Sequence, residues 1–424
     1  MTDILRDIIA RNRGGAAVAI PSVCSAHPDV LRASLRLAQA RDRAVVIEAT
    51  SNQVNQDGGY TGMTPAAFIA FVNRLADETG TDRARILFGG DHLGPQAWRR
   101  LPADQAMAKG RAMVRAYVEA GFSKIHLDCS EGCAGEPAQL GDDITVPRAA
   151  DLGAVCRDAA ADAGALLYVV GTEVPPPGGA RHDDDDDHAD IPATTPEAAR
   201  ATLGAHMAAF AGIGEIGGLV VQPGVEFTPM AVHHLPLARD PGLMAAIAHH
   251  PGVCLEAHST DYQHPAAFVR LAEIGFAFQK VGPALTFAWR QAVYALDQMR
   301  VQAGWGGALV QPAMEALMLA DPAGWQGHYH GDAGALRIQR HFGLADRIRY
   351  YWPRTEAQAT VTALRDDLAG RRLPLPLLAQ VFAPQVLERA EALGGLTPDA
   401  LIAAQVQIAL DPYFFATSGG EGAP

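Results

Sequence analysis

The sequence is poor in cysteine, in long apolar runs and in positive charge, and each shortage excludes a class of protein. Its five cysteines are odd in number and scattered, so they predict neither a disulfide framework nor a zinc ribbon. No apolar run reaches the roughly 18 residues that a membrane span requires, and the N-terminal MTDILRDIIARNRGG lacks the apolar core of a signal peptide. With 34 Lys and Arg against 47 Asp and Glu, the net charge of −13 argues against binding to nucleic acid or to an anionic membrane. We therefore expect a cytoplasmic protein that binds neither.

A short apolar run followed by a helical pattern recurs between residue 16 and about residue 303. The apolar runs lack the alternation of half-buried strands, as is typical of a parallel sheet covered on both faces. Eight such units in about 290 residues predict an α/β fold, a (β/α)₈ TIM barrel, with an open doubly wound sheet as the alternative. The runs are AVAIPSV (17–23), AVVIEAT (44–50), RILFGG (85–90), KIHLDCS (124–130), ALLYVVGTE (165–173), GLVVQPG (218–224), GVCLEAHS (252–259) and FAFQKVGP (276–283).

The strand pattern ends near residue 303, and the rest of the chain has a helical pattern broken by Pro and Gly. We therefore predict a barrel over residues 1–303 that carries the active site and a C-terminal helical domain over residues 304–424.

Residues 174–192 contain five consecutive aspartates and several Pro and Gly, which is typical of a solvated, mobile insertion loop. GIGEIG (212–217) has the glycine spacing of a dinucleotide fingerprint. It closes a helix and precedes a strand, however, so no nucleotide cofactor is predicted.

Polar side chains gather at the ends of the predicted strands, whereas the strand beginnings are mostly small or apolar. In a parallel barrel the strand ends and the loops after them form the active site. FGGDHLGP (88–95) places Asp91 and His92 side by side at the end of the third strand. The other strand ends supply Asn52, His126, Asp128, Glu173, Gln222, Glu226, His258, Ser259 and Lys280, among others.

Two imidazoles and one or two carboxylates from separate strands suit a divalent ion such as zinc or manganese, with open positions for a substrate. We predict His92 and His258 as ligands, together with Glu173 and Glu226. Taken singly, each histidine also fits a hydrogen-bonded residue at the barrel rim. Asp91 is then predicted to exchange protons with the substrate, the alternative being a helix N-cap or a turn residue.

The last predicted strand ends in Lys280, two residues before Gly282, where the final loops of such barrels often bind phosphate. Ser259 and the backbone amide of Gly282 would complete a small anion site. The alternative for Lys280 is a structural ion pair with a strand-end carboxylate. Asn52 and Gln222 are further candidates for contacts with the substrate.

Nine segments of the chain together resemble the GatZ/KbaZ family, the Z-type subunit associated with class II D-tagatose-1,6-bisphosphate aldolase. The resemblance runs from about residue 16 into the C-terminal region, and the aspartate-rich insertion is its chief departure. The most specific segment is EATSNQVNQDGGYTGMTP (48–65). The others are SVCSAHP (22–28), GGDHLGP (89–95), GFSKIHLDCS (121–130), GTEVPPPGG (171–179), VVQPGVEF (220–227), EAHSTDYQ (256–263), KVGPALTFA (280–288) and DRIRYYWP (346–353).

The resemblance implies a metal-dependent barrel related to class II aldolases. In those relatives a strand-three Asp-His pair supplies the proton-transfer acid and a metal ligand, roles that fall here on Asp91 and His92. EAHS implies a metal ligand at His258, and GTE implies one at Glu173. The third histidine ligand of the aldolases has no clear counterpart, since VVQPGVEF offers only Gln222 and Glu226.

Two functions follow from the resemblance. Some family members are non-catalytic partners that stabilise the catalytic aldolase subunit. Others resemble metal-dependent epimerases that interconvert D-tagatose 6-phosphate and D-fructose 6-phosphate. The acids and histidines at the strand ends favour the epimerase, with a phosphorylated ketohexose as substrate and a homo-oligomer as the expected assembly. A kinase is not expected, because the chain has no P-loop.

Inversion at C4 constrains the chemistry, because C4 is not adjacent to the ketone and simple enolisation reaches only C3. Without a nicotinamide site, the remaining route is retro-aldol cleavage of the C3–C4 bond followed by re-addition. That route needs a Lewis-acid metal for the developing negative charge and an acid/base at the C4 hydroxyl, for which Asp91 and Asp128 are the candidates.

Overall fold

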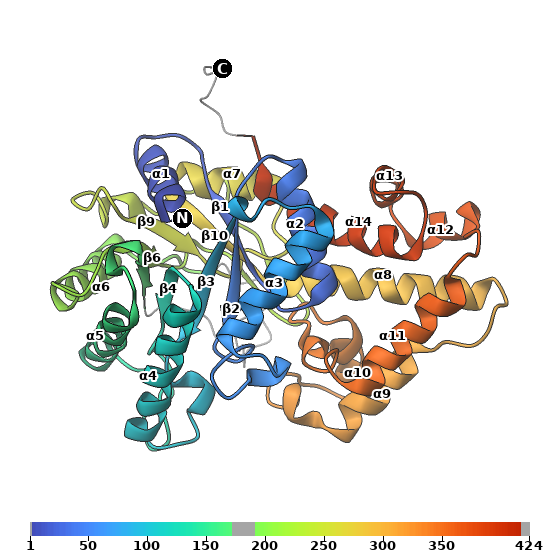
Figure 1. Cartoon of the computed structure of the whole chain (residues 1–424), viewed down its shortest axis with the longest axis horizontal. Helices are drawn as coiled ribbons and strands as arrows, with labels where there is room; N and C mark the ends of the chain where they lie inside the picture. The colour runs from blue at the N-terminus through green and yellow to red at the C-terminus, as the bar shows by residue number, and fades with distance from the viewer. Residues whose placement is uncertain (1, 172–190, 417–424) are drawn as a thin grey trace.

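The fold is a closed eight-stranded parallel barrel in a computed structural model that describes residues 2–171 and 191–416. Around the barrel the strands follow the order β1-β10-β9-β6-β5-β4-β3-β2 (Figure 1). The predicted TIM barrel is therefore confirmed, and the open doubly wound sheet is excluded. The strands are β1 Ile20–Cys24, β2 Val45–Thr50, β3 Ile86–Leu93, β4 Lys124–Leu127, β5 Leu167–Val170, β6 Ile216–Val220, β9 Cys254–Ala257 and β10 Phe276–Val281.

Helices cover the outside of the barrel and explain why the strands are buried on both faces. Five of them, α2, α3, α6, α7 and α8, begin at a proline, whose fixed φ and missing N–H suit the first helical turn. A short hairpin, β7 Glu226–Phe227 and β8 Val232–His233, follows β6 in place of an α-helix. The helices of this part of the chain are α1 Thr2–Arg13, α2 Pro28–Ala40, α3 Pro65–Thr79, α4 Ala103–Ala120, α5 Asp142–Ala159, α6 Pro196–Ala209, α7 Pro265–Glu273 and α8 Pro283–Gln302.

The two ends of the barrel interior differ in polarity. Leu5, Ile8 and Ile9 of α1 join an apolar cluster with inward side chains such as Ile20 and Val46. This cluster closes the end of the barrel at which the strands begin. The buried charged side chains gather toward the other end, so the fold leaves that end for chemistry.

The chain after residue 303 forms helices that lie on one side of the barrel (Figure 1). The last of them, α14, packs against α2 and α8. The chain also returns to the barrel through residues 344–353, where the Tyr262 hydroxyl donates to the Leu344 carbonyl at 2.6 Å. The division at residue 303 remains a prediction. The helices are α9 Val310–Ala320, α10 Ala333–Phe342, α11 Thr355–Leu368, α12 Leu375–Val381, α13 Pro384–Ala392 and α14 Pro398–Leu410.

Glu173 and most of the insertion at 174–192 lie outside the described residues, so the structure does not test the predictions made for them. Among the helices of the described residues, none has the length and apolar character needed to cross a membrane.

The packing of α14 predicts that the C-terminal helices and the barrel unfold together. Leu401 of α14 is fully buried, so Leu401→Ala is expected to lower the free energy of unfolding by about 2–5 kcal/mol through loss of packing and a residual cavity. Leu375→Ala is the control, because Leu375 of α12 is 55% exposed and its truncation should change stability by less than about 0.5 kcal/mol. Chemical denaturation followed by circular dichroism measures both. An early separate transition in Leu401→Ala, with barrel unfolding unchanged, would contradict the expectation.

Candidate active site

Three histidines meet inside the barrel near its strand ends. His92 lies on β3, His126 on β4 and His258 directly after β9, and all three are buried. Their ring centroids are 4.9 Å apart for His92 and His126, and 5.2 Å apart for each of the other two pairs. The structure thus brings together the two histidines expected from the sequence and adds a third.

Backbone strain accompanies this arrangement. His92 and Ser259 adopt φ angles of 47° and 52°, a left-handed backbone conformation that residues other than glycine rarely take. Such strain persists only where surrounding contacts enforce it, and it clusters at functional sites. Here the strained residues are His92, a member of the histidine cluster, and Ser259, which directly follows His258.

Each imidazole bonds to a carboxylate through one ring nitrogen. The Nδ1 of His92 lies 2.8 Å from Asp128 Oδ2, and the Nδ1 of His126 lies 3.0 Å from Asp91 Oδ1. The Nε2 of His258 lies 2.8 Å from Glu256 Oε1. A carboxylate on one nitrogen orients the ring, as in histidines that bind metals through the other nitrogen.

These bonds leave one nitrogen of each ring for a ligand: Nε2 of His92, Nε2 of His126 and Nδ1 of His258. The His126 Nε2 is fully buried and has no hydrogen-bond partner among the described residues. A buried polar atom without a partner costs free energy unless something else satisfies it. The ring nitrogens and carboxylate oxygens also lie close enough to share an ion, in the groups Asp91–His92–His126 and His126–Glu256–His258.

The charges around the histidines are unbalanced in a way that suits a cation. Lys124 lies between two glutamates, with its Nζ 2.6 Å from Glu48 Oε1 and 2.5 Å from Glu256 Oε2. Lys280 bonds to Asp91. With Asp128, four carboxylates face two ammonium groups, which leaves a formal charge of −2 when the imidazoles are neutral. A divalent ion would neutralise it.

The pKa directions agree with neutral imidazoles and ionised carboxylates. Burial lowers the pKa of His126, and it lowers that of His258 well below the usual range. Burial by itself would raise the pKa of Asp91, but His92 and Lys280 outweigh it and hold the value well below normal. The pKa of Asp128 is likewise lowered, because bonds from His92 and Ser130 outweigh its burial. A neutral imidazole is the form that coordinates a metal.

Other residues expected at the site are engaged elsewhere or lie outside the histidine cluster. The Glu226 Oε1 accepts from the Phe227 N–H at 2.9 Å, and no ligand-spaced group among the described residues includes Glu226. The Gln222 Oε1 accepts from the Gly224 and Val225 amides, which closes a turn. Asn52 lines a separate polar cavity of about 510 Å³.

The expected anion site has partners within the protein. The Gly282 amide donates to Asp261 Oδ1 at 3.0 Å, and Lys280 is paired with Asp91, as in the ion-pair alternative. Ser259 lines the cavity beside the histidines. Lys280 therefore brings no uncompensated charge to an incoming anion.

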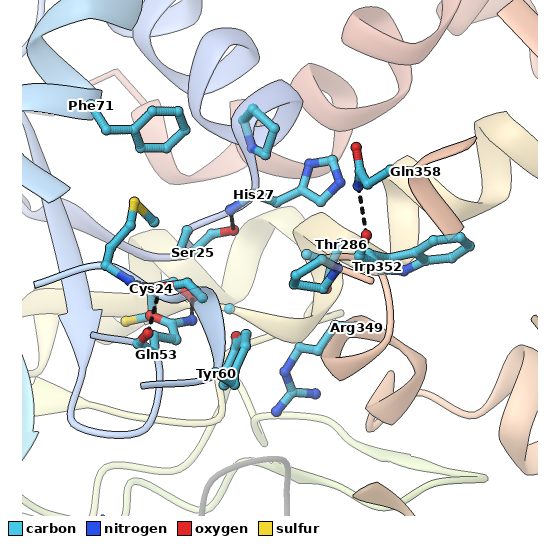
Figure 2. A pocket seen from close by; sticks show the side chains of 16 residues that line it. Cys24, Ser25, His27, Gln53, Tyr60, Phe71, Thr286, Arg349, Trp352 and Gln358 are labelled. Carbon is cyan, nitrogen blue, oxygen red and sulfur yellow. Dashed lines mark hydrogen bonds between the residues drawn. The ribbon is translucent and has the colours of Figure 1, made fainter. Parts of the chain in front are cut away.

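Two adjoining cavities open onto the site. The smaller, about 90 Å³, is lined by Asp91, His92, His258 and Lys280 among others. The larger, about 270 Å³, is shown in Figure 2. They share Cys24, Gly282 and Arg349, so a ligand can extend from one into the other.

Two residues of the site were not among the ligands and acids predicted from the sequence. His126 stands in KIHLDCS at a strand end, and its position beside two other strand-end histidines was the available signal. Arg349 stands in DRIRYYWP, far from any barrel strand in sequence, and only the chain's return to the barrel places it at the cavities.

The buried ion pairs predict a pH-dependent effect of removing Lys124. Lys124→Met is expected to lower the free energy of unfolding at pH 7 by about 3–5 kcal/mol, because Glu48 and Glu256 lose the cation between them. Burial disfavours ionised Glu256, whereas Lys124 and His258 hold its pKa well below normal. The stability that this gives is present above the ordinary glutamate pKa and is lost as the pH falls. The gap between variant and wild type should therefore shrink as the pH falls below the ordinary glutamate pKa of about 4.3.

Denaturant unfolding at several pH values measures this gap. Lys109→Met is the control, because its surface pair with Asp57 is worth at most about 1 kcal/mol. A loss for Lys124→Met that is the same at every pH would show that packing, and not charge, is responsible.

Comparisons with known proteins give matches over nearly the whole chain. A family model described as D-tagatose-1,6-bisphosphate aldolase subunit GatZ/KbaZ-like matches residues 5–418. A relative from Agrobacterium fabrum (strain C58 / ATCC 33970), D-tagatose 6-phosphate 4-epimerase, is 49% identical over 434 residues and covers 100% of both chains. A crystal structure from Sinorhizobium meliloti 1021, described as a "probable tagatose 6 phosphate kinase", has a TM-score of 0.83 and 44% identity, covering 93% of this chain and 99% of the other. The chain therefore belongs to the GatZ/KbaZ-like family of D-tagatose-1,6-bisphosphate aldolase subunits.

Proposed function

We propose that this protein is a metal-dependent D-tagatose 6-phosphate 4-epimerase that acts by cleaving and re-forming the C3–C4 bond. The observation that carries the proposal is the triangle of carboxylate-backed imidazoles beside a sugar-sized pair of cavities. The relative from Agrobacterium fabrum, which bears the same activity in its name, supports it over the full length of the chain.

A nucleotide-dependent activity, such as the kinase named for the Sinorhizobium structure, has less support. GIGEIG (212–217) leads into β6 and does not open a helix, so the glycines are not placed to bind phosphates at a helix N-terminus. The centre near the strand ends, in contrast, has imidazoles and carboxylates of the kind that bind a divalent metal.

In this proposal His92, His126 and His258 hold the divalent metal. The fit rests on the unpartnered Nε2 of His126, on three imidazoles that each have one nitrogen to offer, and on the surrounding charge of −2. When bound, zinc, manganese or a similar ion would supply Lewis-acid stabilisation of negative charge on the ketose oxygens. Glu173 and Glu226 remain predicted additional ligands.

The acids of the site divide into two roles. Asp91 lines the smaller cavity and is proposed to take the proton of the C4 hydroxyl as the C3–C4 bond breaks, and to return it after re-addition. Lys280 holds the Asp91 carboxylate in place through their ion pair. Asp128 has one oxygen on His92 and the other on the Ser130 hydroxyl and amide, so we assign it a positioning role. The larger cavity gives the freed aldehyde room to turn over.

Turnover of D-tagatose 6-phosphate deuterated at C4, by the purified chain alone, tests the proposal. We expect D-fructose 6-phosphate that keeps its deuterium, because bond cleavage leaves the C4–H bond intact. Asp91→Asn should lower kcat by about 10²–10⁴-fold, the usual contribution of a positioned acid/base. Asp77→Asn, the same change at an exposed carboxylate paired with Arg83, is the control and should keep wild-type kcat.

Two outcomes would contradict the proposal in different ways. Exchange of the deuterium with solvent would exclude the cleavage route. No turnover by the chain alone, together with stabilisation of a separate catalytic aldolase chain when the two are mixed, would instead establish the non-catalytic subunit.

A further inference from the structure

We propose that Arg349 is the specificity-determining residue that binds the phosphate of the substrate. The inference rests on the proposed function for the identity of the sugar. Arg349 lines both cavities, and Figure 2 shows its guanidinium turned toward Tyr60. It belongs to a short 3₁₀ turn, Arg347–Tyr350, of the C-terminal part of the chain.

The charge of Arg349 has no carboxylate of its own. Among the described residues, no Asp or Glu oxygen lies within 4.0 Å of its guanidinium. Asp346 is the carboxylate nearest to Arg349 in the sequence. It is buried and forms an ion pair with Arg290, whose Nε lies 3.0 Å from Asp346 Oδ1. The other oxygen of Asp346 accepts from the Thr286 hydroxyl at 2.6 Å. Asp346 is thus paired with Arg290, and Arg349 has no ion pair of its own among the described residues.

Arg349 is held firmly but retains unused donors. Its Nη1 donates to the backbone carbonyls of Ala345 and Asp346, at 2.5 Å and 3.2 Å, and its Nη2 donates to the Tyr350 hydroxyl at 2.9 Å. Within the described part of the chain, Nε–H and one Nη2 proton make no hydrogen bond. A guanidinium presents its donors in a rigid fork that matches phosphate oxygens.

Aromatic rings fix the position of this fork. The guanidinium carbon lies 4.5 Å from the ring centroid of Tyr350, and Tyr60 packs edge-on against Tyr350 with centroids 5.1 Å apart. Tyr60 comes from the loop after β2, so the two tyrosines join the C-terminal chain to the barrel mouth beside Arg349. A preorganised cation loses little conformational entropy when an anion binds.

The other cations near the cavities are less suited to an anion. Lys280 and Lys124 are neutralised by buried carboxylates, as described above. Asp261 also faces Arg349 across the smaller cavity, but its Oδ1 is held by the Gly282 and Ala284 amides. Arg100 is the alternative candidate for binding the phosphate. It lines the polar cavity that Asn52 also lines, and no carboxylate of the described residues lies within 4.0 Å of its guanidinium.

Calorimetric binding of D-fructose 6-phosphate and of D-fructose to the purified full-length protein tests the inference without requiring turnover. Wild type should bind the phosphate ester more tightly than the free sugar. Arg349→Gln should weaken binding of the ester by about 10- to 100-fold and leave binding of D-fructose unchanged, the effect expected for loss of a charged hydrogen-bonded contact. Arg349→Lys, which keeps the charge but not the fork, should lose less. Arg100→Gln is the control and should retain the wild-type preference.

The outcomes separate this inference from the proposed function. An equal preference for the ester in Arg349→Gln and wild type would overturn the role of Arg349. Loss of the preference in Arg100→Gln would do the same and move the phosphate to the other cavity. Arg349-dependent binding of the ester by a protein that does not epimerise it would uphold the inference while refuting the epimerase.

Discussion

The site depends on one kind of interaction, the hydrogen bond between one imidazole nitrogen and a buried carboxylate that accepts it. Two of these bonds cross between neighbouring strands, since Asp91 of β3 holds His126 of β4, and Asp128, just after β4, holds His92 of β3. The third joins Glu256 to His258 two residues later in the chain. Together they determine which nitrogen each ring offers, and so they explain why β3 ends with an acid directly before a histidine. The acid orients the histidine of the next strand.

Burial of these charged groups costs free energy, and opposite charges placed beside them offset that cost. Lys124 and Lys280 lie among the carboxylates, and their charges, together with the histidines, hold the pKa values of Asp91 and Glu256 well below normal despite burial. The balance still leaves negative charge at the histidines, whereas Arg349, which lines both cavities, has no ion pair among the described residues. A metal ion at the histidines and a phosphate at Arg349 would satisfy both.

The sequence was enough to predict a parallel sheet buried on both faces, because it contains apolar runs separated by amphipathic helices, and the number of these units, eight in about 290 residues, favoured the barrel over the open sheet. His126 also stands at a strand end, but it is not among the predicted metal ligands. The alternation of polar and apolar residues along KIHL places Lys124 and His126 on one face of the strand, yet this local pattern does not show that the histidine meets those of two other strands. Arg349 was hidden for another reason, since its position depends on how the C-terminal helices return to the barrel, a long-range contact with no local pattern. Lys280 was found, but its pairing with Asp91 required knowledge of the barrel register.

Anomalous diffraction from crystals of the wild-type protein grown with zinc or manganese, recorded at the absorption edge of the ion, tests the metal site most directly. We expect a peak within bonding distance of His92 Nε2, His126 Nε2 and His258 Nδ1, with Asp91, Asp128 and Glu256 still bound to the opposite ring nitrogens. A peak held by Glu226 away from the histidine cluster would contradict it. So would a cluster that stays empty at saturating metal while its three imidazole–carboxylate bonds remain intact.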